Sequence, residues 1–107
     1  TEMPFGVMGG YYQAMGHAHL ISKVFDFGMD IQEAIDLPRV VPVAGGTKVE
    51  AEHTLSAEAA AELNRRGFEI IPAEDPIGGA QAIRIDWENG TLTAGSEPRK
   101  DGCALGL

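Results

Sequence analysis

A chain of 107 residues is long enough for one domain or for part of a larger one, and its apolar content of 44% is ordinary for a folded globular chain. Sixteen acidic against eight basic side chains give a formal charge of -8, which argues against nucleic acid and anionic membrane surfaces as partners. Cys103 is the single cysteine, so an intrachain disulfide is impossible, and no segment approaches the roughly 18 apolar residues of a transmembrane helix.

The first pattern along the chain is a short strand, a pair of glycines and a long helix. The apolar run at residues 5–8 predicts a buried strand, and residues 11–27 carry apolar side chains at helical spacing. Gly28 is expected to cap that helix because glycine adopts left-handed geometry without penalty. The stripe expected to be buried consists of Ala14, Ala18, Ile21 and Phe25, with Leu20, Val24 and Phe27 beside it.

A second, short helix is expected next. Asp30 is suited to cap it, because its carboxylate can accept from the first free N–H groups of the helix. Pro38 ends it, since proline disfavours helical geometry at the preceding residue. The buried side of this helix is expected to consist of Ile31, Ala34 and Ile35.

The remainder of the chain predicts five strands and one amphipathic helix. Ser56 is a good cap for that helix, which is expected at residues 56–66. Asn89 and Gly90 predict a hairpin with a type I′ turn between the last two strands. The strands are expected at residues 39–43, 47–51, 68–71, 80–88 and 91–94, and the tail from 96 is expected to be irregular. The order indicates a mixed α/β (α+β) chain with a mostly antiparallel sheet at its end.

Gly9 and Gly10 are the strongest local signal for chemistry. A strand, a glycine turn and a helix start form the local geometry in which backbone N–H groups point at an anion. Such an anion is either a ligand or an oxyanion that develops during a reaction. On local evidence a plain turn without a ligand is an equal alternative. The neighbouring side chains Tyr11, Tyr12 and Gln13 are expected either to contact a ligand or to pack beneath the turn.

Other reactive side chains give weaker signals. His17 and His19 are two residues apart on the predicted helix, so they diverge and cannot chelate one metal as a pair. Together with the distant His53 they predict no metal site, and no cofactor is expected. The carboxylates that could suggest a catalytic pair are expected to be solvated; they are Glu52, Glu74 and Asp75.

Thr1 and Cys103 are the two candidate nucleophiles. A free terminal threonine can use its own α-amino group as the base, but Thr1 precedes the glycine pair by few residues, and a chain boundary is the preferred interpretation. Cys103 is expected to be a small apolar filler.

Four motifs together resemble a known family. They are the glycine pair before a long helix, residues 26–39 (DFGMDIQEAIDLPR), residues 78–83 (GGAQAI) and residues 95–102 (GSEPRKDG). In order and spacing they resemble the C-terminal half of the small subunit of γ-glutamyltranspeptidases, over nearly all 107 residues.

The resemblance implies a fold and an activity. Family members are N-terminal-nucleophile hydrolases with a four-layer αββα sandwich, and the precursor cleaves itself to expose a threonine. That threonine attacks a γ-glutamyl amide, of glutathione or a related donor, and the acyl group passes to water or an amino acid. On this sequence the backbone oxyanion hole of the family matches Gly9 and Gly10. The nucleophilic threonine is not expected in this chain, so the chain alone should be inactive.

The resemblance also implies partners. Residues 1–107 would form an incomplete catalytic domain that pairs with the remainder of the small subunit and with the large subunit of the same precursor. A small-molecule γ-glutamyl donor is the expected substrate, and self-association through apolar surface that normally faces the missing half is plausible. Family members are commonly exported, but the compartment stays open.

Two alternatives remain at this point. One is a non-catalytic α/β module that binds a small anion or a protein through the glycine turn. The other is a related amide acylase of the same fold. Met8 stands where family members often have proline or a small residue before the glycine pair, so a donor other than glutathione is an open possibility.

Overall fold

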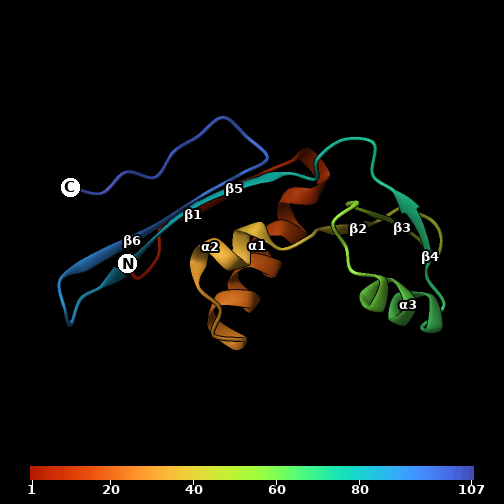
Figure 1. The fold of residues 1–107 in the computed structure, drawn as a ribbon, viewed down its shortest axis with the longest axis horizontal. Helices are drawn as coiled ribbons and strands as arrows, with labels where there is room; N and C mark the ends of the chain where they lie inside the picture. Colours follow the sequence, from red (N-terminus) through yellow and green to blue (C-terminus); the bar gives the residue numbers. More distant parts are fainter. The chain divides into compact units, whose positions relative to one another are not determined.

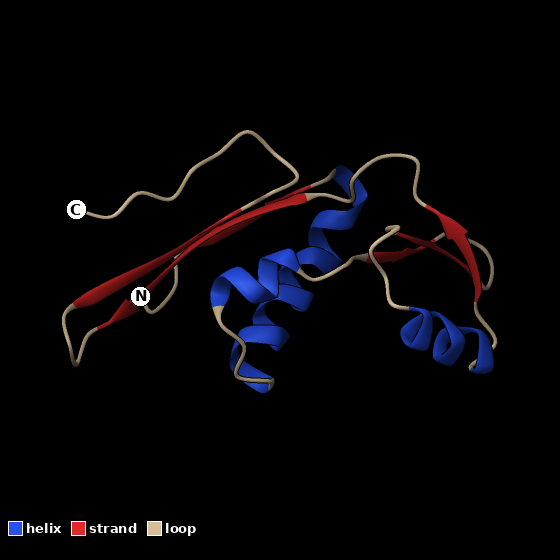
Figure 2. Ribbon diagram, in the orientation of Figure 1, coloured by secondary structure: helices blue, strands red, loops and turns tan.

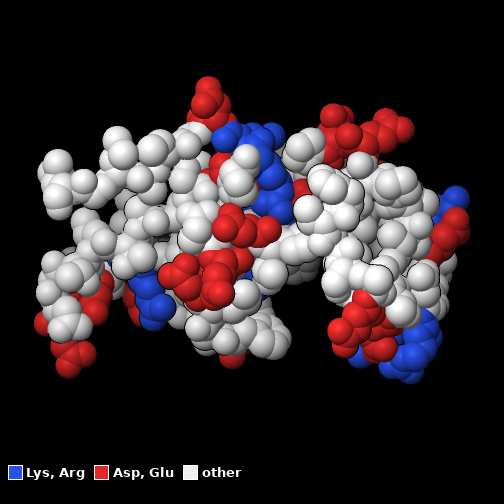
Figure 3. Space-filling model, viewed as in Figure 1, with Lys and Arg blue, Asp and Glu red and all other residues white.

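The computed structural model describes all 107 residues as two compact units, residues Thr1–Leu37 with Gly78–Leu107, and residues Pro38–Ile77 (Figure 1). Both units contain helices and strands, which confirms the mixed α/β class (Figure 2). No helix has both the length and the apolar character that crossing a bilayer requires. Acidic and basic groups are dispersed over the visible face rather than gathered into one patch of a single sign (Figure 3).

The first unit is built on an antiparallel sheet with the strand order β1-β5-β6. Its strands are β1 (Phe5–Met8), β5 (Gly79–Asp86) and β6 (Thr91–Ser96). The register places Val7 opposite Ala80 and Ala82 opposite Gly95. The helices cover one face of this sheet, and the tail after β6 runs along the other face (Figure 1).

The long helix expected at residues 11–27 is present, but it changes its winding twice. It begins as the 3₁₀ turn η1 (Gly10–Tyr12), continues as α1 (Gln13–Ile21) and ends as the π-helical turn η2 (Ser22–Asp26). Gly28 ends it with a φ of 66°, and the N–H of Met29 donates to the carbonyl of Lys23 at 3.0 Å. The predicted glycine cap is therefore confirmed.

The main stripe predicted for this helix is wrong, because Ala14, Ala18, Ile21 and Phe25 are exposed. Of the three residues predicted beside it, Phe27 is exposed, whereas Leu20 and Val24 are buried in one row with Tyr12 and Gly16. The reason is close packing at Gly16, where an added Cβ would lie 2.6 Å from Cγ1 of Val7. Hydrophobicity alone undervalues a glycine that lets a helix approach a strand.

The second helix of this unit is as expected. α2 (Ile31–Asp36) is capped by the Asp30 carboxylate, which accepts from the N–H of Gln32 at 2.9 Å and of Glu33 at 3.3 Å. Its buried side chains are Ile31, Ala34 and Ile35. The side chains of Ile31 and Ile35 reach the sheet at Gly95, where an added Cβ would lie 2.6 Å and 2.9 Å from them.

The hairpin between β5 and β6 is confirmed, but its turn type is not. Asp86 pairs with Thr91, so four residues make the connection, and no residue other than glycine has a positive φ. A type I′ turn needs positive φ at both central residues. Here the Asp86 carboxylate instead accepts the N–H groups of Glu88 and Asn89, each at 3.0 Å, and the Asn89 side chain at 2.8 Å. These bonds hold Asn89 at negative φ.

The hairpin should weaken in acid. Hydrogen bonds from Asn89, the side-chain bond first, lower the pKa of Asp86 below its ordinary value. A lowered folded-state pKa means that the stabilisation is complete above the unfolded-state pKa of about 3.9 and is lost as pH falls through the folded-state value. Amide hydrogen exchange at Glu88 and Asn89 should therefore accelerate, beyond its intrinsic pH dependence, only below about pH 4.

The matched variants for this prediction are Asp86→Ala and Asp86→Asn. The alanine variant should exchange fast at neutral pH as well, whereas asparagine keeps a carbonyl acceptor and should stay partly protected without the acid transition. An unchanged acid transition in Asp86→Asn would assign that transition to another group.

The second unit contains a three-stranded sheet and one helix. β2 (Val40–Pro42) pairs antiparallel with β3 (Lys48–Ala51), and β3 pairs parallel with β4 (Glu69–Pro72). The helix α3 (Ala57–Arg65) connects the parallel pair, and the Ser56 hydroxyl caps it by accepting the N–H of Ala59 at 3.1 Å. These elements lie where the sequence predicts them, and Val41, Val49 and Ala51 are buried in the sheet.

Candidate active site

The glycine corner joins the end of β1 to the start of the helical segment. Gly9 has a φ of 137° and Gly10 a φ of 56°, both in the region that side chains rarely adopt. A Cβ on Gly9 would also lie 2.9 Å from the Cα of Gly78, which itself has a φ of 66°. Backbone geometry and close packing thus both require glycine at position 9, while position 10 requires it for conformation alone.

The N–H groups at this corner lie at the start of a helix. Tyr12 donates its N–H to the carbonyl of Gly9 at 3.0 Å, and Gln13 donates to the carbonyl of Gly10. Neither Gly9 nor Gly10 donates one of these turn bonds, because the first N–H groups of a helix have no acceptor within it. Both glycines are exposed, and no atom lies within 4 Å of where a Cβ on Gly10 would be. The arrangement is able to accept an anion.

Tyr11 and Tyr12 have opposite environments. The Tyr12 ring is 3% exposed and lies beneath the corner, with Cδ1 3.4 Å from the position of an added Cβ on Gly9 and 2.7 Å from that on Gly78. Tyr11 is 74% exposed. Of the two roles left open by the sequence, Tyr12 takes the packing role, whereas Tyr11 presents its ring to solvent beside the glycines.

The histidines of α1 have different surroundings. His17 Nδ1 lies 2.6 Å from the carbonyl of Gln13, and its Nε2 accepts the N–H of Val7 at 3.4 Å. Desolvation by burial, with a smaller contribution from the charge of Lys23, lowers the pKa of His19 below its ordinary value. The chain contains no group of three or more His, Cys, Asp or Glu side chains placed to hold a metal ion.

Glu52 is buried, which the sequence did not predict. It was expected to be solvated like Glu74 and Asp75, which are exposed, but it is only 8% exposed. Its carboxylate accepts the N–H of Arg39 at 2.9 Å and that of Ile77 at 3.0 Å. The Arg39 guanidinium donates to the carbonyl of Ile77 at 2.8 Å. The second unit is thus closed by a buried carboxylate that binds backbone, and the alternating sequence pattern around it gave no sign of this.

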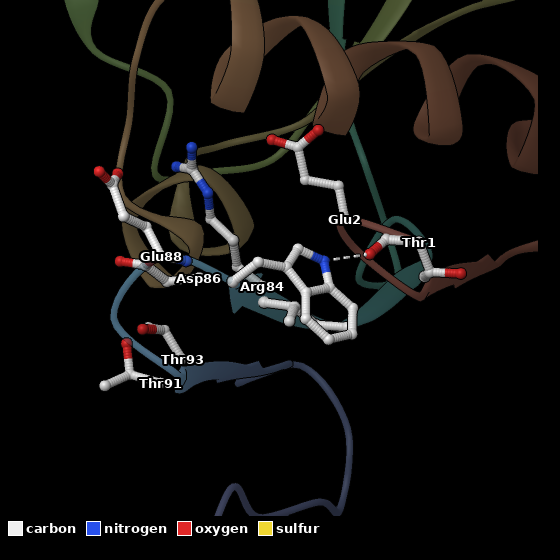
Figure 4. Close-up of a pocket in the computed structure, with 9 residues that line it drawn as sticks. Thr1, Glu2, Arg84, Asp86, Glu88, Thr91 and Thr93 are labelled. Atoms are coloured by element: carbon white, nitrogen blue, oxygen red, sulfur yellow. Dashed lines mark hydrogen bonds between the residues drawn. The ribbon is translucent and has the colours of Figure 1, made fainter.

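The two candidate nucleophiles lie away from the glycine corner. The Thr1 carbonyl accepts the indole N–H of Trp87 at 2.8 Å, in a pocket that Arg84 and Asp86 also line (Figure 4). The neighbouring Glu2 accepts from Ile85, so Thr1 lies at the hairpin end of β5, whereas the glycine corner lies at its other end. Cys103 is exposed, which contradicts its expected role as a buried filler.

Comparison with known proteins decides the family. The profile of the Gamma-glutamyltranspeptidase family matches residues 1–107, which is the whole chain. This chain belongs to the γ-glutamyltranspeptidase family. The resemblance inferred from the sequence motifs is confirmed, and so is the N-terminal-nucleophile hydrolase fold that it implied.

Two similar proteins, one curated and one with a solved structure, cover nearly all of this chain. The glutathione hydrolase-like YwrD proenzyme of Bacillus subtilis (strain 168) is 33% identical over 96% of this chain and 21% of its own length. The crystal structure of cephalosporin acylase from Bacillus halodurans is 40% identical, with a TM-score of 0.85, over 94% of this chain and 19% of that one.

A third comparison concerns the fold alone. The γ-glutamyltranspeptidase from Pseudomonas nitroreducens, in a complex with L-DON, superposes with a TM-score of 0.87 at 22% identity, over 99% of this chain and 55% of that one. The chain therefore spans about a fifth of the curated relative's length and about half of this solved γ-glutamyltranspeptidase chain.

The two sequence motifs that together mark the family in this chain, residues 26–39 and 95–102, bind each other. The Gln32 amide of the helix motif pairs with the backbone of Ser96 in the closing motif, accepting its N–H and donating to its carbonyl, both at 2.9 Å. The Arg99 guanidinium donates to the carbonyl of Ile35 at 3.0 Å and to that of Leu37 at 2.9 Å. The motifs are specific as a pair because they build one structure.

Glu97 completes this contact and was missed by the sequence reasoning. It is 1% exposed and accepts the N–H of Ala80 at 2.7 Å and the Arg99 guanidinium at 2.8 Å. The available signal was the Ser-Glu-Pro-Arg segment itself, in which an acidic and a basic residue two apart follow directly on a strand. Because the sequence does not reveal that β5 leaves an N–H open beside it, the carboxylate could not be assigned.

Proposed function

We propose that residues 1–107 form the C-terminal portion of the small subunit of a γ-glutamyltransferase or hydrolase, and that the N–H groups of Gly9 and Gly10 are its oxyanion hole. The observation that carries this is the corner itself, two exposed glycines with positive φ at a helix start. It lies in a chain that matches the family over its whole length. The rest of the small subunit and the large subunit would be its partners, as in the proenzymes among its relatives.

The proposed reaction proceeds through a threonyl ester. A threonine outside this chain attacks the γ-glutamyl amide carbon through its hydroxyl oxygen, and its own α-amino group takes the proton. The carbonyl oxygen becomes an oxyanion and is stabilised by the two glycine N–H groups. The C–N bond then breaks, and the amine leaves with a proton. Water or an amino acid attacks the ester in the second step, which frees the threonine.

The decisive experiment compares the parent protein, meaning the longer polypeptide of this proposal, with the 107-residue chain. Intact mass spectrometry of the parent should show two chains after maturation, and the mature protein should release p-nitroaniline from γ-glutamyl-p-nitroanilide. The 107-residue chain alone should release none. Release that depends on Thr1 would overturn the assignment of the nucleophile, and a parent that neither matures nor turns over would overturn the function.

The isolated chain is also expected to self-associate, because it exposes large apolar side chains. Sedimentation of the same preparation checks this, and a clean monomer would contradict it. The most exposed of these side chains in the helical segment and the hairpin are Tyr11, Phe25, Phe27, Trp87 and Leu92.

An amide acylase of the same fold is the second candidate. Two relatives favour it, the cephalosporin acylase at 40% identity and the Acylase ACY 1 proenzyme of Pseudomonas sp. (strain V22) at 31%. Substrate profiling separates the two: an acylase should cleave an N-acylated cephalosporin faster than γ-glutamyl-p-nitroanilide, and a transpeptidase should show the reverse. Both functions use the same oxyanion hole.

A further inference from the structure

We propose that His17 is a positioning residue for the proposed reaction, and that its neutral imidazole holds strand β1 to helix α1 and thereby fixes the Gly9–Gly10 corner. The inference rests on the proposed function of that corner. It assigns to His17 no contact with the substrate.

The two hydrogen bonds of the ring define its tautomer. The Gln13 carbonyl can only accept, so Nδ1, 2.6 Å away, carries the proton and donates it. The Val7 N–H can only donate, so Nε2, 3.4 Å away, is the unprotonated acceptor. Both bonds therefore exist together only in the neutral ring with the proton on Nδ1. An imidazolium would present a second N–H to the Val7 N–H.

The Val7 N–H lies on the open edge of the sheet. Pro4 accepts the N–H of Ile83 and Glu2 accepts that of Ile85, so the even-numbered residues of this segment exchange hydrogen bonds with β5. In an antiparallel pair the alternate residues direct their N–H and carbonyl groups to the other side. Since β1 is the first strand in the order β1-β5-β6, no strand of this chain pairs with that edge. His17 takes the place of a strand acceptor there.

The hydrogen bond between Val7 and His17 lies close enough to the glycine corner to influence its geometry. Only Met8 separates Val7 from Gly9. The residue before His17 is Gly16, where an added Cβ would lie 2.6 Å from Cγ1 of Val7, and the His17 ring also contacts the ring of Phe5 with 5.4 Å between centroids. The strand and the helix that form the two arms of the corner are therefore joined through His17 at Val7, two residues before Gly9. A small displacement of an oxyanion donor is costly for catalysis.

The test uses the mature parent protein with two His17 variants. His17→Leu removes both hydrogen bonds but keeps a side chain of similar volume, whereas His17→Gln keeps one hydrogen-bond donor and one acceptor. His17→Leu should lower kcat by roughly 10- to 100-fold with little change in KM, because the loss falls on transition-state stabilisation. His17→Gln should recover most of that loss. His53→Leu, an exposed histidine of the second unit, is the matched control and should leave kcat unchanged.

Unfolding temperature separates positioning from folding. The proposal expects the kcat of His17→Leu to fall at temperatures well below its unfolding transition. It is overturned if the glutamine and leucine variants lose turnover equally, or if His17→Leu turns over like the wild type. In the latter case, loss of turnover on removal of the Gly10 N–H would leave the proposed function standing.

A direct reading of the tautomer keeps the proposal testable if both variants fail to fold. Long-range ¹H–¹⁵N NMR of the ¹⁵N-histidine-labelled parent should show the proton of His17 on Nδ1. A proton on Nε2, or on both nitrogens, would overturn the proposal.

Discussion

Replacing the N–H of Gly10 with an ester oxygen is expected to slow turnover of the mature parent enzyme by about 10²- to 10³-fold, the usual loss for one oxyanion-hole donor. The substitution introduces glycolic acid at position 10. Like glycine, this residue has no side chain, so the corner can keep its φ of 56°. Gly10→Pro also removes the N–H, but proline fixes φ near -65°, so its effect would report a broken corner. Steady-state kinetics should show the loss in kcat and in kcat/KM alike.

The matched control for this experiment is the ester at Tyr12. An ester at Gly10 also weakens the Gly9 carbonyl, which accepts the N–H of Tyr12 at 3.0 Å. An ester at Tyr12 replaces the N–H that donates this hydrogen bond and leaves the Gly10 N–H in place. It should cost much less turnover than the ester at Gly10. Equal losses in the two esters, or wild-type turnover with the Gly10 ester, would remove Gly10 from the oxyanion hole.

Local chemistry accounts for the parts of the fold that the sequence predicted. Gly28, Asp30 and Ser56 end or begin helices through bonds to their own neighbours, so residue type and position were enough. The glycine corner belongs to the same group, because Gly9 and Gly10 follow a strand directly and precede a helix.

Contacts between distant segments account for the parts that were missed. The buried row of the long helix depends on Gly16, whose importance appears only when β1 lies against it. The buried state of Glu52 depends on backbone N–H groups at Arg39 and Ile77, which the sequence cannot bring together. Polar side chains that bind remote backbone therefore look like ordinary surface residues in the sequence. Glu97 is the second such side chain, and the one with the largest expected effect on stability.

Glu97→Gln is expected to lower the free energy of unfolding of the mature parent protein by about 3–5 kcal/mol, the usual cost of breaking a buried ion pair on one side. The carboxylate of Glu97 is fully buried and the Arg99 side chain is 11% exposed, so water screens the attraction between the two charges only weakly. In the β5–β6 ladder Gln81 pairs with Ser96, so continuing the register by one residue places Glu97 opposite Ala80. Its side chain therefore takes the Ala80 N–H where a strand carbonyl would otherwise accept it.

The double variant with Arg99→Met separates pairing from burial. Arg99→Met alone removes the guanidinium that donates to the Glu97 carboxylate and to the carbonyls of Ile35 and Leu37, so it should destabilise strongly. Combined with Glu97→Gln it should cost less than the sum of the single variants, because each single variant already breaks the hydrogen bond between the two side chains. Asp101→Asn, which removes an exposed charge four residues along the tail, should stay within about 0.5 kcal/mol of the wild type. Urea unfolding gives the free energy of unfolding of the two single variants, the double variant and the Asp101→Asn control. If the Arg99→Met proteins do not fold, Arg99→Lys replaces them, because lysine keeps the charge but lacks the planar guanidinium. Strictly additive losses would contradict a coupled pair.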